Sequence, residues 1–286
     1  MGLTACLLIP MKGSVALLIF AVGLDSRPKD FGYLRRRPGV MLRSQLAMYI
    51  VVPVLAVLAL KGLRLPSGIE LALIVLAISA GAPMLPRKLM QLGNEEYVVS
   101  LTVISSLLAI VTVPAWIVLL QPHFDRLHAL DPSAVAGVLG KSFLLPMLFG
   151  MAVRKTFPGS SARLSDVMLK AVGSFFSVCA LALLALHWKA VGAAFGPPIL
   201  ALGGFTFAAL VVGHLMGGPD PNDRTALAVT CATLHIGVAM VTAAVTVGPR
   251  IAVLIVAYIL ASVVVIIPYM SWRNRAARAK PRLAAR

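Results

Sequence analysis

Residues 97–120 read YVVSLTVISSLLAIVTVPAWIVLL, and no charged side chain interrupts them. A helix needs about 20 apolar residues to cross the hydrocarbon core of a bilayer, so this run predicts a transmembrane helix. The whole chain has the same character, since 59% of its 286 residues are hydrophobic and only 13% are charged. A soluble domain carries about 25% charged residues, so the composition indicates an integral membrane protein.

Charges, Gly-Pro turns and polar clusters divide the chain into nine apolar segments. They lie at about 3–24, 40–60, 69–85, 97–120, 134–153, 167–188, 197–216, 225–247 and 251–270. Helices satisfy their own backbone hydrogen bonds, as a bilayer requires. We therefore expect an all-α membrane protein of about nine transmembrane helices in a single domain, 1–286. Pro10 and Lys12 interrupt the first segment, which we expect to be short or tilted.

Lys and Arg are distributed unevenly between the two sets of loops. Eighteen of the 26 fall on one side: Arg27, Lys29, Arg35, Arg36, Arg37, Arg87, Lys88, Arg154, Lys155, Arg163, Lys170, Arg224, Arg273, Arg275, Arg278, Lys280, Arg282 and Arg286. Five fall on the other: Lys61, Arg64, Arg126, Lys189 and Arg250. The positive-inside rule then places the N-terminus outside and the basic tail, 271–286, in the cytoplasm.

This charge pattern also bears on partners and location. Basic residues scattered through short loops form no basic face, so we expect no nucleic-acid partner. The tail is expected to be solvated or to contact lipid headgroups. We expect a multi-pass protein of the inner (plasma) membrane, with the lipid bilayer as its surroundings.

The third segment, ELALIVLAISAGAPMLPRKLM at 70–90, contains a cluster of helix breakers. Gly81, Pro83 and Pro86 stand close together, and each proline removes a backbone donor, so the helix should stop or unwind near Ser79–Pro86. Unwound backbone at membrane depth lines a cavity or is buried in protein, and secondary transporters build binding sites from it. The alternative is a simple proline kink, or a turn at the cytoplasmic end.

The eighth segment, TALAVTCATLHIGVAMVTAAVTV at 225–247, is interrupted near its middle by Thr230, Thr233, His235 and Gly237. An ionisable residue at depth is a functional candidate. The alternative for His235 is a neutral imidazole bonded to a nearby carbonyl. We predict that Gly81–Pro86 and Thr233–Gly237 are non-helical or distorted and lie close together. Asp223, just before this segment, is expected to be a helix N-cap.

The fourth segment carries three hydroxyl side chains close together. Thr102, Ser105 and Ser106 share part of one helix face, where they either line a path or bond a neighbouring helix.

The sequence has no Gly-rich phosphate loop, no HExxH and no nucleophile elbow. We therefore expect no enzyme activity, no cofactor and no catalytic residue.

Three stretches resemble the bile acid:sodium symporter family. They are FAVGLDSRPKDFGYLRRRPGVMLRSQLAMYIVVP at 20–53, LPSGIELALIVLAISAGAPMLPRKLMQLGNEEYVVSLTVISS at 65–106 and NDRTALAVTCATLHIGVAM at 222–240. The resemblance extends from about Phe20 to Met270 and implies an inverted-repeat secondary transporter with two broken, crossing helices. It implies a panel of helices at about 3–24, 134–153 and 167–188, and a core at about 40–120 and 197–270. The substrate would be a small organic solute, with Arg87 and Lys88 favouring an organic anion.

The family's sodium positions are largely replaced here. Met84 and Leu85 stand where sodium-coupled members have Ser-Asn, Thr230 where they have Glu, Leu234 and His235 where they have Gln-Asn, and Met48 where they have Gln. Thr102 matches a hydroxyl ligand. We therefore predict no sodium site, and expect either a proton on His235 to replace sodium as coupling ion or plain facilitated diffusion. Sodium is the alternative coupling ion.

The candidate substrate-binding or crossover residues are Ser79, Gly81, Pro83, Met84, Pro86, Thr102, Ser105, Thr230, Thr233 and His235. The alternative to a transporter is a non-transporting membrane sensor or assembly protein that retains the fold.

Overall fold

The computed structural model describes residues 3–26, 36–62, 65, 67–79, 95–189, 197–246 and 249–284. Every regular element within those ranges is a helix. The α-helices are α1 (Leu3–Asp25), α3 (Pro38–Leu46), α4 (Val52–Gly62), α5 (Ser67–Ile78), α7 (Glu95–Leu120), α8 (Pro132–Leu139), α9 (Leu145–Thr156), α10 (Pro158–Leu186), α12 (Pro197–Met216), α13 (Pro221–Thr233), α14 (Ile236–Thr246) and α15 (Pro249–Ala284).

Short helical segments of other types join some of these. The π-helical segment η1 (Ala47–Val51) connects α3 to α4, and η4 (Gly140–Leu144) connects α8 to α9. A proline follows each within two residues, Pro53 and Pro146. The 3₁₀ segments η2 (Gln121–His123) and η3 (Asp125–Ala129) lie between α7 and α8.

Six stretches of the described chain are long and apolar enough to cross a membrane. They are Cys6–Asp25, Pro38–Gly62, Glu96–His123, Pro132–Thr156, Pro158–Leu186 and Ile199–Met216. Large apolar side chains also face outward, for example Leu200 and Leu215, each 72% exposed. Such a surface is unfavourable in water and favourable in lipid, so the all-helical membrane fold expected from the composition is confirmed.

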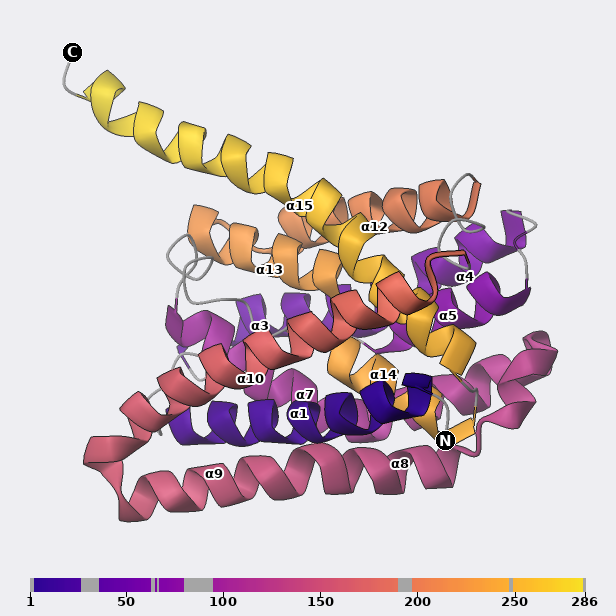
Figure 1. The fold of residues 1–286 in the computed structure, drawn as a ribbon. Helices are drawn as coiled ribbons and strands as arrows, with labels where there is room; N and C mark the ends of the chain where they lie inside the picture. Colours follow the sequence, from indigo (N-terminus) through magenta and orange to yellow (C-terminus); the bar gives the residue numbers. More distant parts are fainter. Residues whose placement is uncertain are drawn as a thin grey trace.

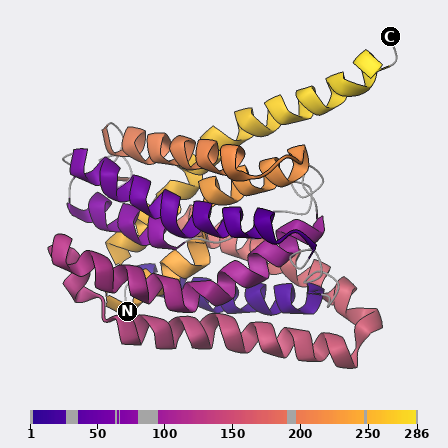
Figure 2. The ribbon, with the colours of Figure 1, turned by 180° about the vertical axis from the view of Figure 1, so that it is seen from behind.

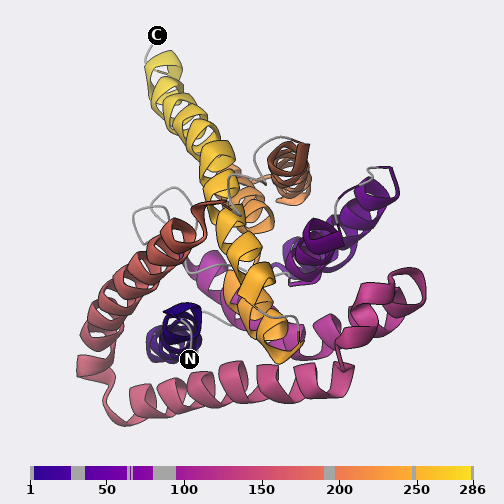
Figure 3. The ribbon, with the colours of Figure 1, turned by 45° about the vertical axis from the view of Figure 1, so that its right-hand side comes forward.

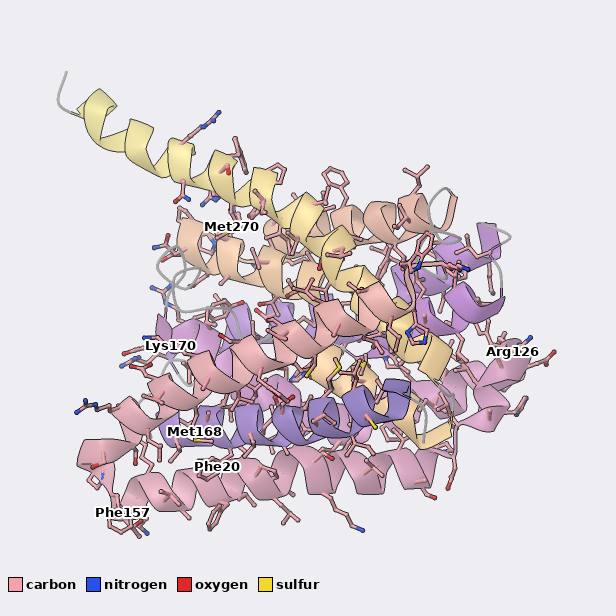
Figure 4. The ribbon with its side chains drawn as sticks, viewed as in Figure 1. Phe20, Arg126, Phe157, Met168, Lys170 and Met270 are labelled. Atoms are coloured by element: carbon pink, nitrogen blue, oxygen red, sulfur yellow. The ribbon has the colours of Figure 1, made fainter. Side chains whose placement is uncertain are left out.

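The long helices run roughly side by side, and α15 crosses the bundle obliquely before its C-terminal part projects beyond it (Figures 1 and 2). Helix α1 packs against α9 and α10, and Figure 3 shows it nearly end on, in the corner between them. Helix α12 packs against α13 and α15. Figure 4 shows Arg126 near one end of the bundle and Phe157, between α9 and α10, near the other.

Three helices have other lengths than expected. The first segment is not short, because α1 continues through Pro10 over 23 residues. Helix α10 begins at Pro158 rather than near 167, with the proline at its first position, where its missing N–H costs nothing. Helix α15 runs on through the basic tail to Ala284.

Candidate crossover site

The second interruption lies where the sequence predicts it. Helix α13 ends at Thr233 and α14 begins at Ile236, which leaves Leu234 and His235 outside both helices. Leu234 has φ 50° and ψ 176°, in a region that normally only glycine occupies. Such a conformation costs about 1–3 kcal/mol, so the surrounding packing must hold it in place.

A tyrosine compensates for the end of α13. In a continuous helix the Ala232 carbonyl would accept a hydrogen bond from the N–H of residue 236, four residues later. The chain turns away there, and Tyr258 of α15 donates its hydroxyl to that carbonyl at 2.5 Å. Tyr258 and Ala232 are both fully buried, so this bond replaces one that water cannot supply.

The end of α5 meets the α13–α14 interruption at Ser79. Helix α5 ends at Ile78, and Ser79 forms a bend. The backbone N–H of His235 donates to the Ser79 carbonyl at 2.8 Å. This bond joins the end of α5 to the break between α13 and α14. The predicted approach of Gly81–Pro86 to Thr233–Gly237 stays a prediction. Gly81, Pro83, Met84 and Pro86 lie outside the described residues.

The His235 side chain lies among groups from several helices. Its Nε2 is 3.4 Å from the Ser106 hydroxyl on α7, and its Nδ1 accepts the Val238 N–H at 3.2 Å. Its ring meets the edge of the Phe143 ring of η4, with centroids 5.2 Å apart. His235 is 6% exposed, so its surroundings are protein rather than water.

The hydroxyls named from the sequence divide into two groups. Those of Thr102, Ser105 and Thr233 donate to carbonyls of their own helices. Those of Ser79 and Thr230 are buried and have no hydrogen-bond partner within the described part of the chain. The second group thus has hydroxyl hydrogens that no acceptor within the described residues takes.

Sequence reasoning missed a supporting contact between α7 and the first π-helical segment. Pro53 has no N–H for the Tyr49 carbonyl four residues earlier, and Trp116 donates its indole N–H to that carbonyl at 2.8 Å. The Tyr49 hydroxyl donates to the Ser105 carbonyl at 2.6 Å. Pro53 was the available signal, because a proline within a membrane helix leaves a carbonyl that another group must satisfy.

The cap of α13 also differs from the expectation. Asp220 is the N-cap, and its carboxylate accepts the Asn222 N–H at 2.8 Å. Asp223 lies in the first turn, is 1% exposed, and is 3.6 Å from the Arg37 guanidinium. Both carboxylates lie at the positive end of the helix dipole, which favours them. No group of three or more His, Cys, Asp or Glu within the described ranges is arranged to hold a metal.

The geometry so far defines a class: a helical membrane protein in which the end of α5 meets the break between α13 and α14 inside the bundle. The family model for the sodium bile acid symporter family matches residues 14–193. This chain belongs to that family, which is one of transporters and not of enzymes. The match includes the predicted first interruption but ends before the second.

Individual relatives are more distant. The chain is 26% identical over 144 residues to the uncharacterized sodium-dependent transporter YocS of Bacillus subtilis (strain 168), which is 50% of this chain and 44% of that one. It is 24% identical over 212 residues, and 23% over 211, to the probable chloroplastic sodium/metabolite cotransporters BASS6 and BASS5 of Arabidopsis thaliana. These matches cover 72% and 71% of this chain and 51% of each relative. The chain thus spans about half the length of the relatives it matches.

Proposed function

We propose that this chain is a secondary transporter that moves a small organic solute, of the organic-anion class, across the inner membrane. The observation that carries the proposal is the 2.8 Å hydrogen bond between the His235 N–H and the Ser79 carbonyl. It joins the end of α5 to the break between α13 and α14. In our proposal the third segment is also interrupted after Ser79, and secondary transporters build their binding sites from two such broken helices. The family membership and the printed names of the relatives support transport.

The proposal includes a division of the helices into a panel and a core. We assign about 3–24, 134–153 and 167–188 to the panel and about 40–120 and 197–270 to the core. The full fold then has nine spans and inverted repeats. The packing of α1 against α9 and α10 supports the panel.

The interruption lies against this proposed panel. His235 contacts Phe143 of η4, and Gly237 approaches α1 so closely that an added side-chain carbon would lie 2.9 Å from Val15 Cγ1. A solute bound at the interruption would therefore contact both groups of helices. Relative motion of the two groups could then expose the solute to either side of the membrane.

We further propose that transport does not require sodium. A sodium ion that leaves water needs several oxygen ligands, and burying its charge without them is very costly. Within the described residues Asp223 is the one fully buried carboxylate, and it lies at the start of α13 rather than at the interruption. Met48 and Leu234, which by resemblance stand where sodium-coupled members have ion ligands, are buried and offer a thioether and an alkyl group.

The test is uptake into proteoliposomes. The probes are radiolabelled cholate and a set of small mono- and dicarboxylates, measured with sodium or with choline at fixed pH. We expect at least one probe to enter above the level of empty liposomes, and its rate to be the same in choline. A large loss in choline would refute sodium independence, and uptake of no probe by the folded protein would contradict the transport proposal.

A matched pair of variants tests the site. Thr230→Val removes a buried hydroxyl without a partner, so we expect slower uptake. Thr112→Val removes a hydroxyl of α7 that bonds its own helix at Leu108, and uptake should not change. Equal uptake by the two variants would show that Thr230 is not part of the substrate site.

A further inference from the structure

His235 occupies the N-cap position of α14. The helix begins at Ile236, so Val238 is its third residue, and the first four N–H groups of a helix have no partner within it. An N-cap side chain commonly accepts the N–H of the second or third residue. The Nδ1 atom of His235 accepts the Val238 N–H at 3.2 Å.

This bond determines where the imidazole proton lies. A neutral imidazole has one N–H and one acceptor nitrogen. Since Nδ1 accepts a backbone N–H, the proton of the neutral ring is on Nε2. Nε2 lies 3.4 Å from the Ser106 hydroxyl, which therefore accepts the hydrogen bond.

A charged ring does not fit this arrangement. In imidazolium both nitrogens are donors, so the bond from Val238 would be replaced by two opposed N–H groups. The charge would also lie at the N-terminus of α14, which is the positive end of its dipole. The side chains that contact the ring from α7 and η4 are those of Ser106 and Phe143, and both are uncharged.

Gly237 makes room for the ring in this position. A side-chain carbon added at Gly237 would lie 3.3 Å from Cε1 and 3.4 Å from Nδ1 of His235, as well as 2.9 Å from Val15. The glycine thus allows the capping ring to pack beside α14 while α1 approaches on the other side.

We propose that His235 is a neutral positioning residue, and not a proton carrier. Its side chain caps α14 and bonds Ser106 of α7, while its backbone holds the end of α5. The inference depends on the proposed transport function only where it concerns the role of His235 in uptake. The capping of α14 by His235 and the neutral state of its ring do not depend on that function.

Three substitutions at His235 test the hydrogen bonds of Nδ1 and Nε2 separately. In His235→Asn the amide oxygen takes the place of Nδ1, so the cap is kept and the bond to Ser106 is lost. In His235→Gln the amide reaches Ser106 and the cap is lost. His235→Ala loses both bonds.

The first readout is thermal unfolding of the purified full-length protein. We expect His235→Ala to lower the Tm by about 2–8 °C and His235→Asn to recover most of that loss. We expect the Tm of His235→Gln to be nearer to that of His235→Ala than to that of His235→Asn. If Asn is as unstable as Ala, the capping role is refuted, whatever the protein transports.

The second readout is spectroscopic. With ¹⁵N-labelled histidine, the signals missing from the His235→Asn spectrum belong to His235. We expect them to show the proton on Nε2 alone at both pH 6 and pH 8. A ring that becomes doubly protonated within this interval would overturn the proposal.

The third readout is the pH profile of uptake for whichever probe is transported. We expect His235→Asn to keep the wild-type ratio of rates at pH 6 and pH 8. A wild-type pH response that disappears in His235→Asn would make His235 a proton carrier after all. If no probe is transported, the transport proposal fails, while the unfolding and spectroscopic results still decide the role of His235.

Discussion

Tyr258 shows how a single side chain compensates for a broken helix. Its hydroxyl donates to the Ala232 carbonyl at 2.5 Å, and the site is fully buried. Tyr258→Phe deletes only the oxygen and leaves a buried carbonyl without its donor. We expect the free energy of unfolding to fall by about 1–3 kcal/mol, measured by denaturant or thermal unfolding in detergent.

Tyr269→Phe is the comparison for Tyr258→Phe. Its hydroxyl is 2.9 Å from His214 Nδ1 at a partly buried site, where water can replace a lost partner. The loss should therefore be smaller than at Tyr258. An equal loss in the two variants would mean that the Ala232 carbonyl finds another donor when Tyr258 is changed.

Asp131 provides a pH dependence outside the membrane-spanning segments. It caps α8, and the hydroxyl and then the backbone N–H of Ser133 hold the pKa of its carboxyl below the ordinary 3.8. Because the folded pKa is the lower one, the carboxylate stabilises the fold above pH 3.8. This contribution is lost as pH falls through the lower, folded value.

We therefore expect Asp131→Ala to lower the Tm at neutral pH. The difference from wild type should shrink as pH falls from 3.8 through the lower, folded pKa, because the wild-type carboxylate becomes protonated. Thermal unfolding of both proteins across that interval measures it. A difference that stays constant would show that the carboxylate charge has no role in the cap.

The sequence identifies the interruption at the second break but not the residue that bears the strain. Thr233, His235 and Gly237 were the visible signals, whereas the positive φ belongs to Leu234, a residue with no local preference for it. Tertiary contacts at the neighbouring His235 overrule local preference there. Similarly, spacing placed Thr102, Ser105 and Ser106 on one face, but could not show that Ser106 reaches His235.

At the scale of elements, α1 and α9 pack through two glycines. A side-chain carbon added at Gly150 would lie 2.9 Å from the Leu24 nitrogen and 3.0 Å from the Gly23 Cα. Both neighbours are backbone atoms that cannot rotate away. Small residues allow such close approach of helices in membranes, where van der Waals packing drives their association.

We expect Gly150→Ala to force α1 and α9 apart and to lower the free energy of unfolding by about 1–3 kcal/mol. Gly137→Ala on α8 is the control, because nothing lies within 4 Å of its added carbon. It should be neutral or slightly stabilising, since alanine favours a helix over glycine. A neutral Gly150→Ala would show that the two helices separate at no cost.

Apolar runs located most helices, because length and hydrophobicity are properties of the local sequence. Helix α7 at Glu95–Leu120 and α12 at Pro197–Met216 agree closely with the runs at 97–120 and 197–216. The polar stretch before 167 concealed the first turns of α10, which are helical although they are not apolar. The π-helical segments η1 and η4 escaped notice because the prolines after them have the same pattern as ordinary kinks.

At the scale of the molecule, the distribution of charge predicts its orientation. Arg126 lies near one end of the bundle, and the turn at Phe157 lies near the other (Figure 4). Arg154 and Lys155 precede this turn and Arg163 follows it, and all three are among the eighteen Lys and Arg residues assigned to one side of the membrane. Arg126 is one of the five assigned to the other side. Segments rich in Lys and Arg are retained in the cytoplasm during insertion, so the Phe157 end should face it.

We therefore expect the tail beyond Arg273 to be cytoplasmic. Arg273 donates to the Thr225 hydroxyl and to the Pro221 carbonyl, each at 2.8 Å, so the base of the tail is tied to the start of α13. The tail and the start of α13 must then lie on one side, and Arg224 in α13 belongs to the same set of eighteen basic residues as the tail. A green fluorescent protein fused after Arg286 should fluoresce, and alkaline phosphatase at the same position should be inactive. Insertion of the same reporters beside Arg126 should give the reverse result, and that insertion serves as the internal control. An active phosphatase after Arg286 would overturn the orientation, and would mean that the eighteen basic residues do not set the topology of this chain.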